Sequence, residues 1–194
     1  MGRSLLDSSV RLLNHTEVVY APGDRALARD LFRAVGCRVL DPQEESGPDD
    51  LGAAAGPYLI VFVEPDSGDL IDNVLYASEV PPAQWAFEQA IAERVVVDDG
   101  LRAALDGYNA SFHSYPQGMT HFGIAMNEDQ LEAALDTIAA SPQFEGRLQV
   151  TGVFRPGDPG SVDPRVIQAF LRTDIISTGL LTAGQQIELQ VRLD

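Results

Sequence analysis

Residues 120–126 read Thr-His-Phe-Gly-Ile-Ala-Met, and residues 14–20 read Asn-His-Thr-Glu-Val-Val-Tyr. In both stretches a histidine stands at the head of a short strand-like segment. Each of these segments is followed by a stretch with the apolar spacing of an amphipathic helix. Its apolar residues stand at i, i+4 and i+8 from Leu27 in the first stretch, and at i, i+4 and i+7 from Leu131 in the second. Such spacings gather the apolar side chains on one helical face. The chain therefore contains a weak internal repeat of a strand–helix unit.

Three further strand-like segments follow each predicted helix. In the first copy they are residues 37–40, 58–64 and 73–80, and in the second copy they are residues 148–154, 166–173 and 185–193. Turn-rich stretches lie between them, because residues 41–56 and 155–164 are dense in Pro, Gly and Asp. The order strand, helix, strand, strand, strand occurs twice. It predicts an α+β protein with two βαβββ modules, residues 1–80 and 119–194, within one structural domain.

A helical segment, residues 81–118, is predicted to connect the two modules. Its first helix is predicted to start at Pro81-Pro82, and its second is predicted to be capped by Asp98. Asp24 and Asn127 are predicted to cap the helices of the two modules. The second helix carries an apolar stripe, made of Leu101, Leu105, Tyr108 and Phe112. We expect that stripe to be buried against the rest of the chain or against a second subunit, which leaves a homodimer open.

Composition excludes several classes of protein. The 194 residues include 13 Lys+Arg and 29 Asp+Glu, a formal charge of −16, which argues against nucleic-acid and anionic-membrane partners. No apolar run approaches the roughly 20 residues of a membrane span, and residues 1–13 lack a signal-peptide core. The single cysteine, Cys37, excludes an intramolecular disulfide and Cys-based zinc clusters. We therefore expect a soluble, cytoplasmic, acidic protein.

The final predicted strand alternates sharply between polar and apolar side chains. Its polar face consists of Gln186, Glu188, Gln190 and Arg192. That face either is solvated, as in many antiparallel sheets, or lines a concave pocket. The strand at residues 121–126 favours the pocket, because Gly123 and Ala125 share a face with His121 and leave space beside the imidazole.

Two histidines at corresponding repeat positions, together with one carboxylate, indicate a metal site. The predicted ligands are His15, His121 and Glu188. Two neutral imidazoles and a carboxylate suit Fe(II), Mn(II), Ni(II) or Zn(II) and leave coordination positions open for substrate. The remaining histidine, His113, is expected at the surface or at a pocket rim.

The duplicated order, the two leading histidines and the Gln-Ile-Glu-Leu-Gln of residues 186–190 resemble the vicinal oxygen chelate superfamily. That superfamily includes glyoxalase I, extradiol dioxygenases and bleomycin-resistance proteins. The resemblance covers nearly the whole chain except residues 81–118. It implies that the two modules form one cupped mixed sheet with the metal inside the cup, and it carries the ligand roles to His15, His121 and Glu188.

The first module departs from the glyoxalase I pattern, which places a fourth ligand on its last strand. Tyr76 aligns with Glu188 there, and Glu79 and Glu64 are further candidates for a ligand. We expect Tyr76 and Glu64 to serve instead as proton-transfer groups. Two histidines and one glutamate resemble the dioxygenase branch, which favours Fe(II). The alternatives are a glyoxalase-like isomerase, lyase or epimerase, and a metal-free small-molecule binder of the drug-resistance type.

Overall fold

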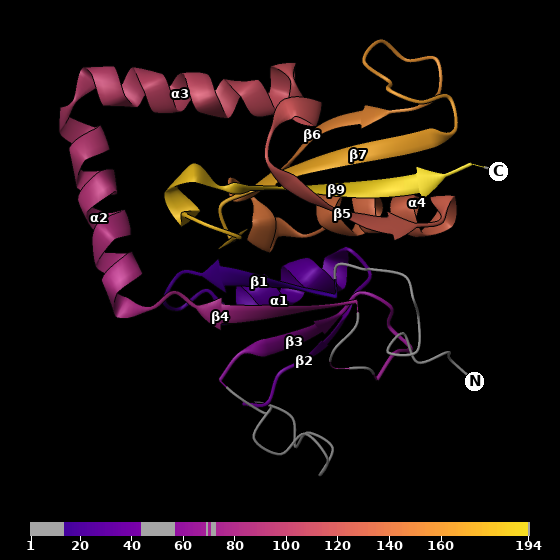
Figure 1. Ribbon diagram of the computed structural model, residues 1–194, viewed down its shortest axis with the longest axis horizontal. Coiled ribbons are helices and arrows are strands. Elements are labelled where there is room, and N and C mark those ends of the chain that lie inside the picture. Colours follow the sequence, from indigo (N-terminus) through magenta and orange to yellow (C-terminus); the bar gives the residue numbers. More distant parts are fainter. Residues whose placement is uncertain (1–13, 44–56, 69, 71–72, 194) are drawn as a thin grey trace.

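The structure is a computed structural model that describes residues 14–43, 57–68, 70 and 73–193 (Figure 1). It confirms the α+β class. The first half contains β1 (His15–Tyr20), α1 (Arg25–Ala34), β2 (Arg38–Leu40), β3 (Leu59–Phe62) and β4 (Val74–Glu79). The middle contains α2 (Pro82–Val97), α3 (Asp99–Ser114) and the short 3-10 helix η3 (Pro116–Gly118). The second half contains β5 (His121–Met126), α4 (Glu128–Ala139), η4 (Pro142–Phe144), β6 (Leu148–Phe154), β7 (Val166–Thr173), β8 (Ile176–Ser177), η5 (Leu181–Ala183) and β9 (Gln185–Arg192).

The predicted repeat is present, with β8 as an addition to the second copy. In each copy the first strand pairs in parallel with the last, so the sheet orders are β2-β3-β4-β1 and β6-β7-β9-β5. The described strands form two sheets rather than the single cupped sheet that the resemblance implies, because β1 and β5 do not pair. Instead β8, from the second half, pairs with the free edge of β1 and extends the first sheet.

One hydrophobic core joins the two sheets. In Figure 1 the sheets lie one above the other with β1 and β5 at the facing edges, and α1 and α4 lie near that seam. The two helices contact each other. Buried side chains from both, such as Leu31 and Leu131, belong to the same core cluster as Val61 of the first sheet and Leu189 of the second. The core uses one face of each sheet. On the opposite face of the first sheet Leu40, Ile60, Phe62 and Val74 form a smaller apolar cluster, whereas the opposite face of the second sheet carries Gln186 and Glu188.

The predicted N-terminal cap forms in the helix of the second module but not in the helix of the first. Asn127 caps α4 in a capping box, in which Gln130 N donates to Asn127 Oδ1 at 2.9 Å and Asn127 N donates to Gln130 Oε1 at 2.9 Å. Asp24 precedes α1 but makes no side-chain cap. Its carboxylate instead accepts from Arg147 Nη2 at 2.8 Å, so the predicted cap is wrong because a cation from the other module binds it.

The connecting helices α2 and α3 are more exposed than the sequence predicts. Asp98 caps α3 as expected, accepting from Leu101 N at 3.0 Å. Of the predicted stripe, Phe112 is buried, but Leu101 is 38% exposed and Tyr108 is 39% exposed. Burial of these two within the chain is therefore a wrong prediction. Figure 1 shows the reason, since α2 and α3 meet at a corner away from the sheets and only the far end of α3 approaches β6.

Candidate functional site

The strand registers make the two modules directly comparable. In the first sheet Glu17 of β1 lies opposite Tyr76 of β4, and in the second sheet Gly123 of β5 lies opposite Glu188 of β9. Glu17 and Gly123 each come two residues after the histidine that begins their strand. Tyr76 therefore occupies the position in the first module that Glu188 occupies in the second, as the sequence alignment predicts.

The polar face of β9 is buried at Gln186 and Glu188, half-buried at Gln190 and exposed at Arg192. Glu188 is 6% exposed and Gln186 is 0% exposed. Glu188 Oε1 accepts from Gln168 Nε2 at 2.6 Å and from Gln190 Nε2 at 2.8 Å. These two amides satisfy one carboxylate oxygen and leave Oε2 as the oxygen that can act on another group.

His121 faces that second oxygen. Its Nε2 lies 3.1 Å from Glu188 Oε2, and its ring stands edge-on to Phe170 with centroids 5.7 Å apart. The other ring nitrogen, Nδ1, lies 2.7 Å from Met119 O. A carbonyl oxygen only accepts, so Nδ1 carries the proton of this hydrogen bond. In the neutral imidazole Nε2 then carries a lone pair, and that lone pair points at a carboxylate oxygen.

Two lone pairs at this separation need a cation between them. A proton meets the need by making an imidazolium–carboxylate hydrogen bond. A divalent metal ion meets it equally well, because bonds of roughly 2.0–2.2 Å at a right angle separate the two ligand atoms by about 3.0 Å. The hydrogen bond from Nδ1 to a backbone carbonyl is also the usual outer support of a metal-bound histidine. The His121–Glu188 pair therefore fits either ion.

A cavity of about 580 Å³ lies beside this pair, at the seam between the modules. It is lined by Thr16, Val63, Asn73, Val74, Leu75, His121, Phe122, Gly123, Ile124 and Ala125. A side chain at Gly123 would begin 3.6 Å from Glu188 Oε2, so the glycine keeps the approach to the carboxylate open. Gly123 and Ala125 thus line open space beside His121.

The first-module residues of the predicted site lie elsewhere. His15 stacks edge-on against Tyr76, with centroids 6.2 Å apart, and its Nδ1 lies 2.9 Å from Asn14 Oδ1. The Tyr76 hydroxyl donates to Leu70 O. Among the described residues no group of three or more His, Cys, Asp and Glu side chains is arranged to hold a metal ion. The structure therefore brings His121 and Glu188 together and does not add His15 to them.

The other acidic candidates are at the surface. Glu64 follows β3 and is exposed, and Glu79 is exposed at the end of β4. The residues that the sequence reasoning missed are Gln168 and the carbonyl of Met119. Gln190 shares a face with Glu188 two residues away, so strand alternation alone could have indicated it as a support. Gln168 comes from the neighbouring strand, and only its register reveals the contact.

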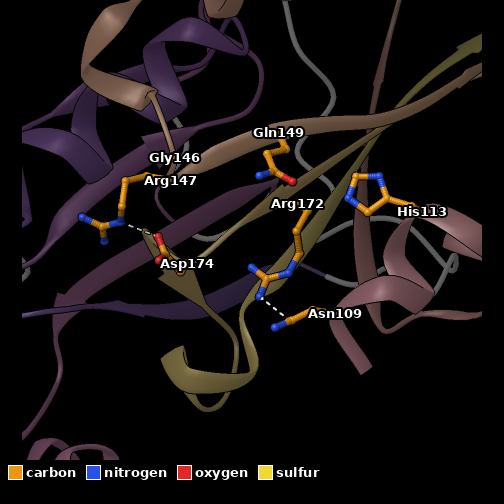
Figure 2. Close-up of a pocket in the computed structure, with 7 residues that line it drawn as sticks. All are labelled: Asn109, His113, Gly146, Arg147, Gln149, Arg172 and Asp174. Atoms are coloured by element: carbon orange, nitrogen blue, oxygen red, sulfur yellow. Dashed lines mark hydrogen bonds and ion pairs between the residues drawn. The ribbon is translucent and has the colours of Figure 1, made fainter. Parts of the chain in front are cut away.

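A second cavity, of about 210 Å³, lies between the end of α3 and the β6–β7 edge (Figure 2). Its lining consists of Asn109, His113, Gly146, Arg147, Gln149, Arg172 and Asp174. Arg147 forms two ion pairs, because its Nη2 donates to Asp24 and its Nε donates to Asp174. His113 is exposed and lines this cavity, in agreement with its predicted place at a surface or rim.

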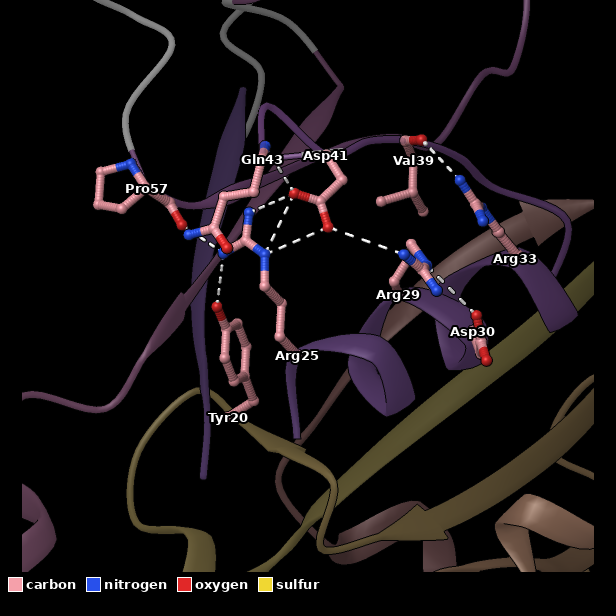
Figure 3. A network of polar contacts seen from close by, with 9 residues as sticks. All are labelled: Tyr20, Arg25, Arg29, Asp30, Arg33, Val39, Asp41, Gln43 and Pro57. Carbon is pink, nitrogen blue, oxygen red and sulfur yellow. Dashed lines mark hydrogen bonds and ion pairs between the residues drawn. The ribbon is translucent and has the colours of Figure 1, made fainter. Parts of the chain in front are cut away.

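A third polar cluster joins α1 to the strands beside it (Figure 3). Arg25 Nη2 donates to Asp41 Oδ1 at 2.6 Å and Arg25 Nη1 donates to the Tyr20 hydroxyl at 2.8 Å. Burial alone would raise the pKa of Asp41, but the hydrogen bonds from Arg25 and from Gln43 N outweigh it and hold that pKa below its ordinary value. Asp41 is 1% exposed, so this cluster is a closed ion pair that fastens α1 rather than an open site.

Comparisons with known proteins add no family to this picture. No family model, no curated protein and no solved structure matches the chain. In the part of the chain that the structure describes, no helix has the length and apolar character needed to cross a membrane.

Proposed function

We propose that the protein is a small-molecule enzyme of the vicinal oxygen chelate type, centred on His121 and Glu188 and dependent on a divalent metal ion. The observation that supports the proposal is the 3.1 Å separation of His121 Nε2 and Glu188 Oε2, with Nδ1 engaged by Met119 O. The adjoining cavity has a volume within the usual range for small organic ligands.

In this proposal each residue has a defined task. Glu188 supplies one carboxylate oxygen, because Gln168 and Gln190 hold the other. His121 supplies Nε2, and the hydrogen bond to Met119 O keeps its ring in the productive orientation. A bound divalent ion would supply Lewis-acid chemistry and, as Fe(II), a route for electrons to O₂. Phe122, Ile124 and Leu75 supply an apolar wall that excludes water from the substrate.

Within this class a dioxygenase-like reaction is our first choice, on a substrate that binds the metal through two neighbouring oxygens. Two protein ligands leave enough coordination positions for such a substrate and a further small molecule. His15 would be the third protein ligand of the resemblance, and its addition would require its side chain to leave Tyr76 and turn toward His121. We include a cytoplasmic location in the proposal, since a chain with one cysteine has no intramolecular disulfide of the kind common in secreted proteins.

The second candidate is a metal-free protein of the same fold. The His121–Glu188 pair favours it, since a proton between Nε2 and Oε2 gives both atoms a hydrogen-bond partner without a metal ion. Such a pair could exchange a proton with a bound substrate as an acid–base catalyst, or it could donate a hydrogen bond to a ligand that is only bound.

Anaerobic titration with Fe(II) or Mn(II) separates the two candidates. The proposal expects one tight site in the wild-type chain that is lost in His121→Ala and Glu188→Gln. His113→Ala removes the same residue type outside this cavity and should bind as the wild type does. His15→Ala tests the third ligand, and oxygen consumption separates a dioxygenase from an isomerase. Absence of metal binding by the wild-type chain, together with tight binding of an organic ligand, would overturn the proposal in favour of the metal-free protein.

A further inference from the structure

The second cavity contains a half-buried cation, Arg172, that forms no ion pair with any described carboxylate. Arg172 extends from β7 and its hydrogen bonds all go to neutral oxygens: Thr173 O, Asn109 Oδ1 at 3.2 Å and Ala183 O at 3.3 Å. Its guanidinium carbon lies 4.7 Å from the centroid of the Phe112 ring. No carboxylate among the described residues forms an ion pair with it, whereas the neighbouring Arg147 has two.

The position of this guanidinium is built into the fold. Gly184 has a φ of +68°, and a Cβ at that position would overlap the guanidinium of Arg172. The glycine is therefore needed both for the turn and for the space that the cation occupies. Three segments far apart in the sequence thus converge on one side chain, since Asn109 comes from α3, Arg172 from β7 and Ala183 from η5.

Burial of an unmatched cation is unfavourable unless something binds it. Burial lowers the pKa of Arg172 below its ordinary value, and the nearby Asp174 and Tyr108 offset only part of that effect. The chain as a whole carries −16, so its long-range field repels anions and attraction must come from the local donors. Of the two arginines at the cavity, Arg147 is paired with Asp24 and Asp174, whereas Arg172 is paired with no described carboxylate.

We infer that this cavity is a binding site for the carboxylate group of a small organic acid, with Arg172 as its anchor. One cation without an ion pair matches a monoanion, and charge-assisted hydrogen bonds to a carboxylate are strong. The Nε–H and one Nη1–H of Arg172 are not donated to any described oxygen and can serve the ligand. Gln149 lies directly opposite Arg172 on β6, and its amide adds a donor. Figure 2 shows Gln149 above Arg172, with His113 on one side and Arg147 with Asp174 on the other. The site is separate from the His121–Glu188 cavity and does not depend on the proposed function.

The test uses benzoate as the probe, titrated calorimetrically into the full chain at pH 7 and low salt. Benzyl alcohol has the same ring without the carboxylate, and phenylphosphonate has the same ring with a phosphoryl-type anion. We expect benzoate to bind, benzyl alcohol not to bind, and phenylphosphonate to bind at least tenfold more weakly. Arg172→Gln should weaken benzoate at least tenfold, whereas Arg192→Gln, which removes an equal charge from an exposed position, should leave it within twofold.

A second variant keeps the test valid if Arg172→Gln fails to fold. Gln149→Glu places a carboxylate opposite Arg172, where it should pair with the guanidinium and occupy the site from within. We expect that variant to lose benzoate binding and to melt at a higher temperature, whereas Gln149→Ala, which removes only the amide donor, should weaken binding a few fold without abolishing it. Equal binding of benzoate and benzyl alcohol, unchanged affinity in Gln149→Glu, or tighter binding of phenylphosphonate would each overturn the assignment.

Discussion

Replacement of Glu88 should release the connecting helices from the rest of the molecule. Glu88 is 2% exposed, and it is the buried residue of α2. Its carboxylate accepts from Leu181 N at 2.8 Å, from Thr182 N at 2.9 Å, from the Thr182 hydroxyl and from Gln84 Nε2 at 3.2 Å. These contacts tie α2 to η5, nearly a hundred residues further along the chain.

The magnitude follows from what Glu88→Ala leaves behind. Two backbone N–H groups lose a charged acceptor, and each charged hydrogen bond contributes about 1.5–3 kcal/mol net. Partial access of water to the opened site offsets some of this, so we expect a loss of about 3 kcal/mol. Because Glu88 is the buried residue of its helix, the loss should appear as local opening of α2 and η5 before the core unfolds.

Amide hydrogen exchange at pH 7 measures this local free energy. We expect the amides of Leu181 and Thr182 to exchange about a hundredfold faster in Glu88→Ala, since about 1.4 kcal/mol corresponds to a factor of ten. The amides of β7, which lie in the core, should change little. Glu93→Ala, on an exposed position of the same helix, is the matched control and should cost less than about 0.5 kcal/mol. Unchanged exchange at both Leu181 and Thr182 would refute the reasoning.

The same contact should depend on pH. Burial alone would raise the pKa of Glu88, but the hydrogen bonds from Thr182, Gln84 and Leu181 outweigh burial and hold that pKa below its ordinary value of 4.5. A carboxyl whose pKa is lower in the folded state stabilises that state fully above its unfolded pKa. The stabilisation is then lost as the pH falls from 4.5 through the lower, folded value. Protection of the two amides should therefore decline in that window in the wild type and stay flat in Glu88→Ala.

Three further outcomes are expected from single substitutions. Asp41→Asn removes the charge that pairs with Arg25 in a buried site, and urea unfolding should show a loss of about 3 kcal/mol or more; a loss below about 1 kcal/mol would contradict the closed ion pair. Gly184→Ala forces a side chain into the space of Arg172 and a strained φ, so the melting temperature should fall by several degrees. Val97→Asp should cost less than about 0.5 kcal/mol, because Val97 is 72% exposed; a larger cost, or a change of mass in solution, would show that a partner covers this end of α2.

Much of the architecture could be predicted from local patterns. The bounds of β6 and β7 and the capping box at Asn127 agree with the sequence prediction, because alternation and capping depend on neighbours only a few residues away. The repeat itself is visible for the same reason. Each copy must bury one sheet face and one helix face, and that requirement leaves a regular apolar period in the chain.

What lay beyond prediction depends on contacts between segments far apart in the sequence. The alternation of β9 could not tell whether its polar face is solvated, and the burial of Gln186 and Glu188 follows from the coverage by neighbouring strands and η3. The cap at Asp24 failed because Arg147 of the other module competes for its carboxylate.

The sequence by itself determined the α+β class, the duplicated strand–helix order and the candidacy of His121 and Glu188, since these reside in short-range periodicity and residue type. Only the tertiary structure decided that Glu188 pairs with His121 while His15 lies against Tyr76. It also decided that Arg172 lies in a slot made by Asn109, Phe112 and Gly184. Such placements arise from how the sheets, helices and loops pack together, and no stretch of a few residues encodes that packing.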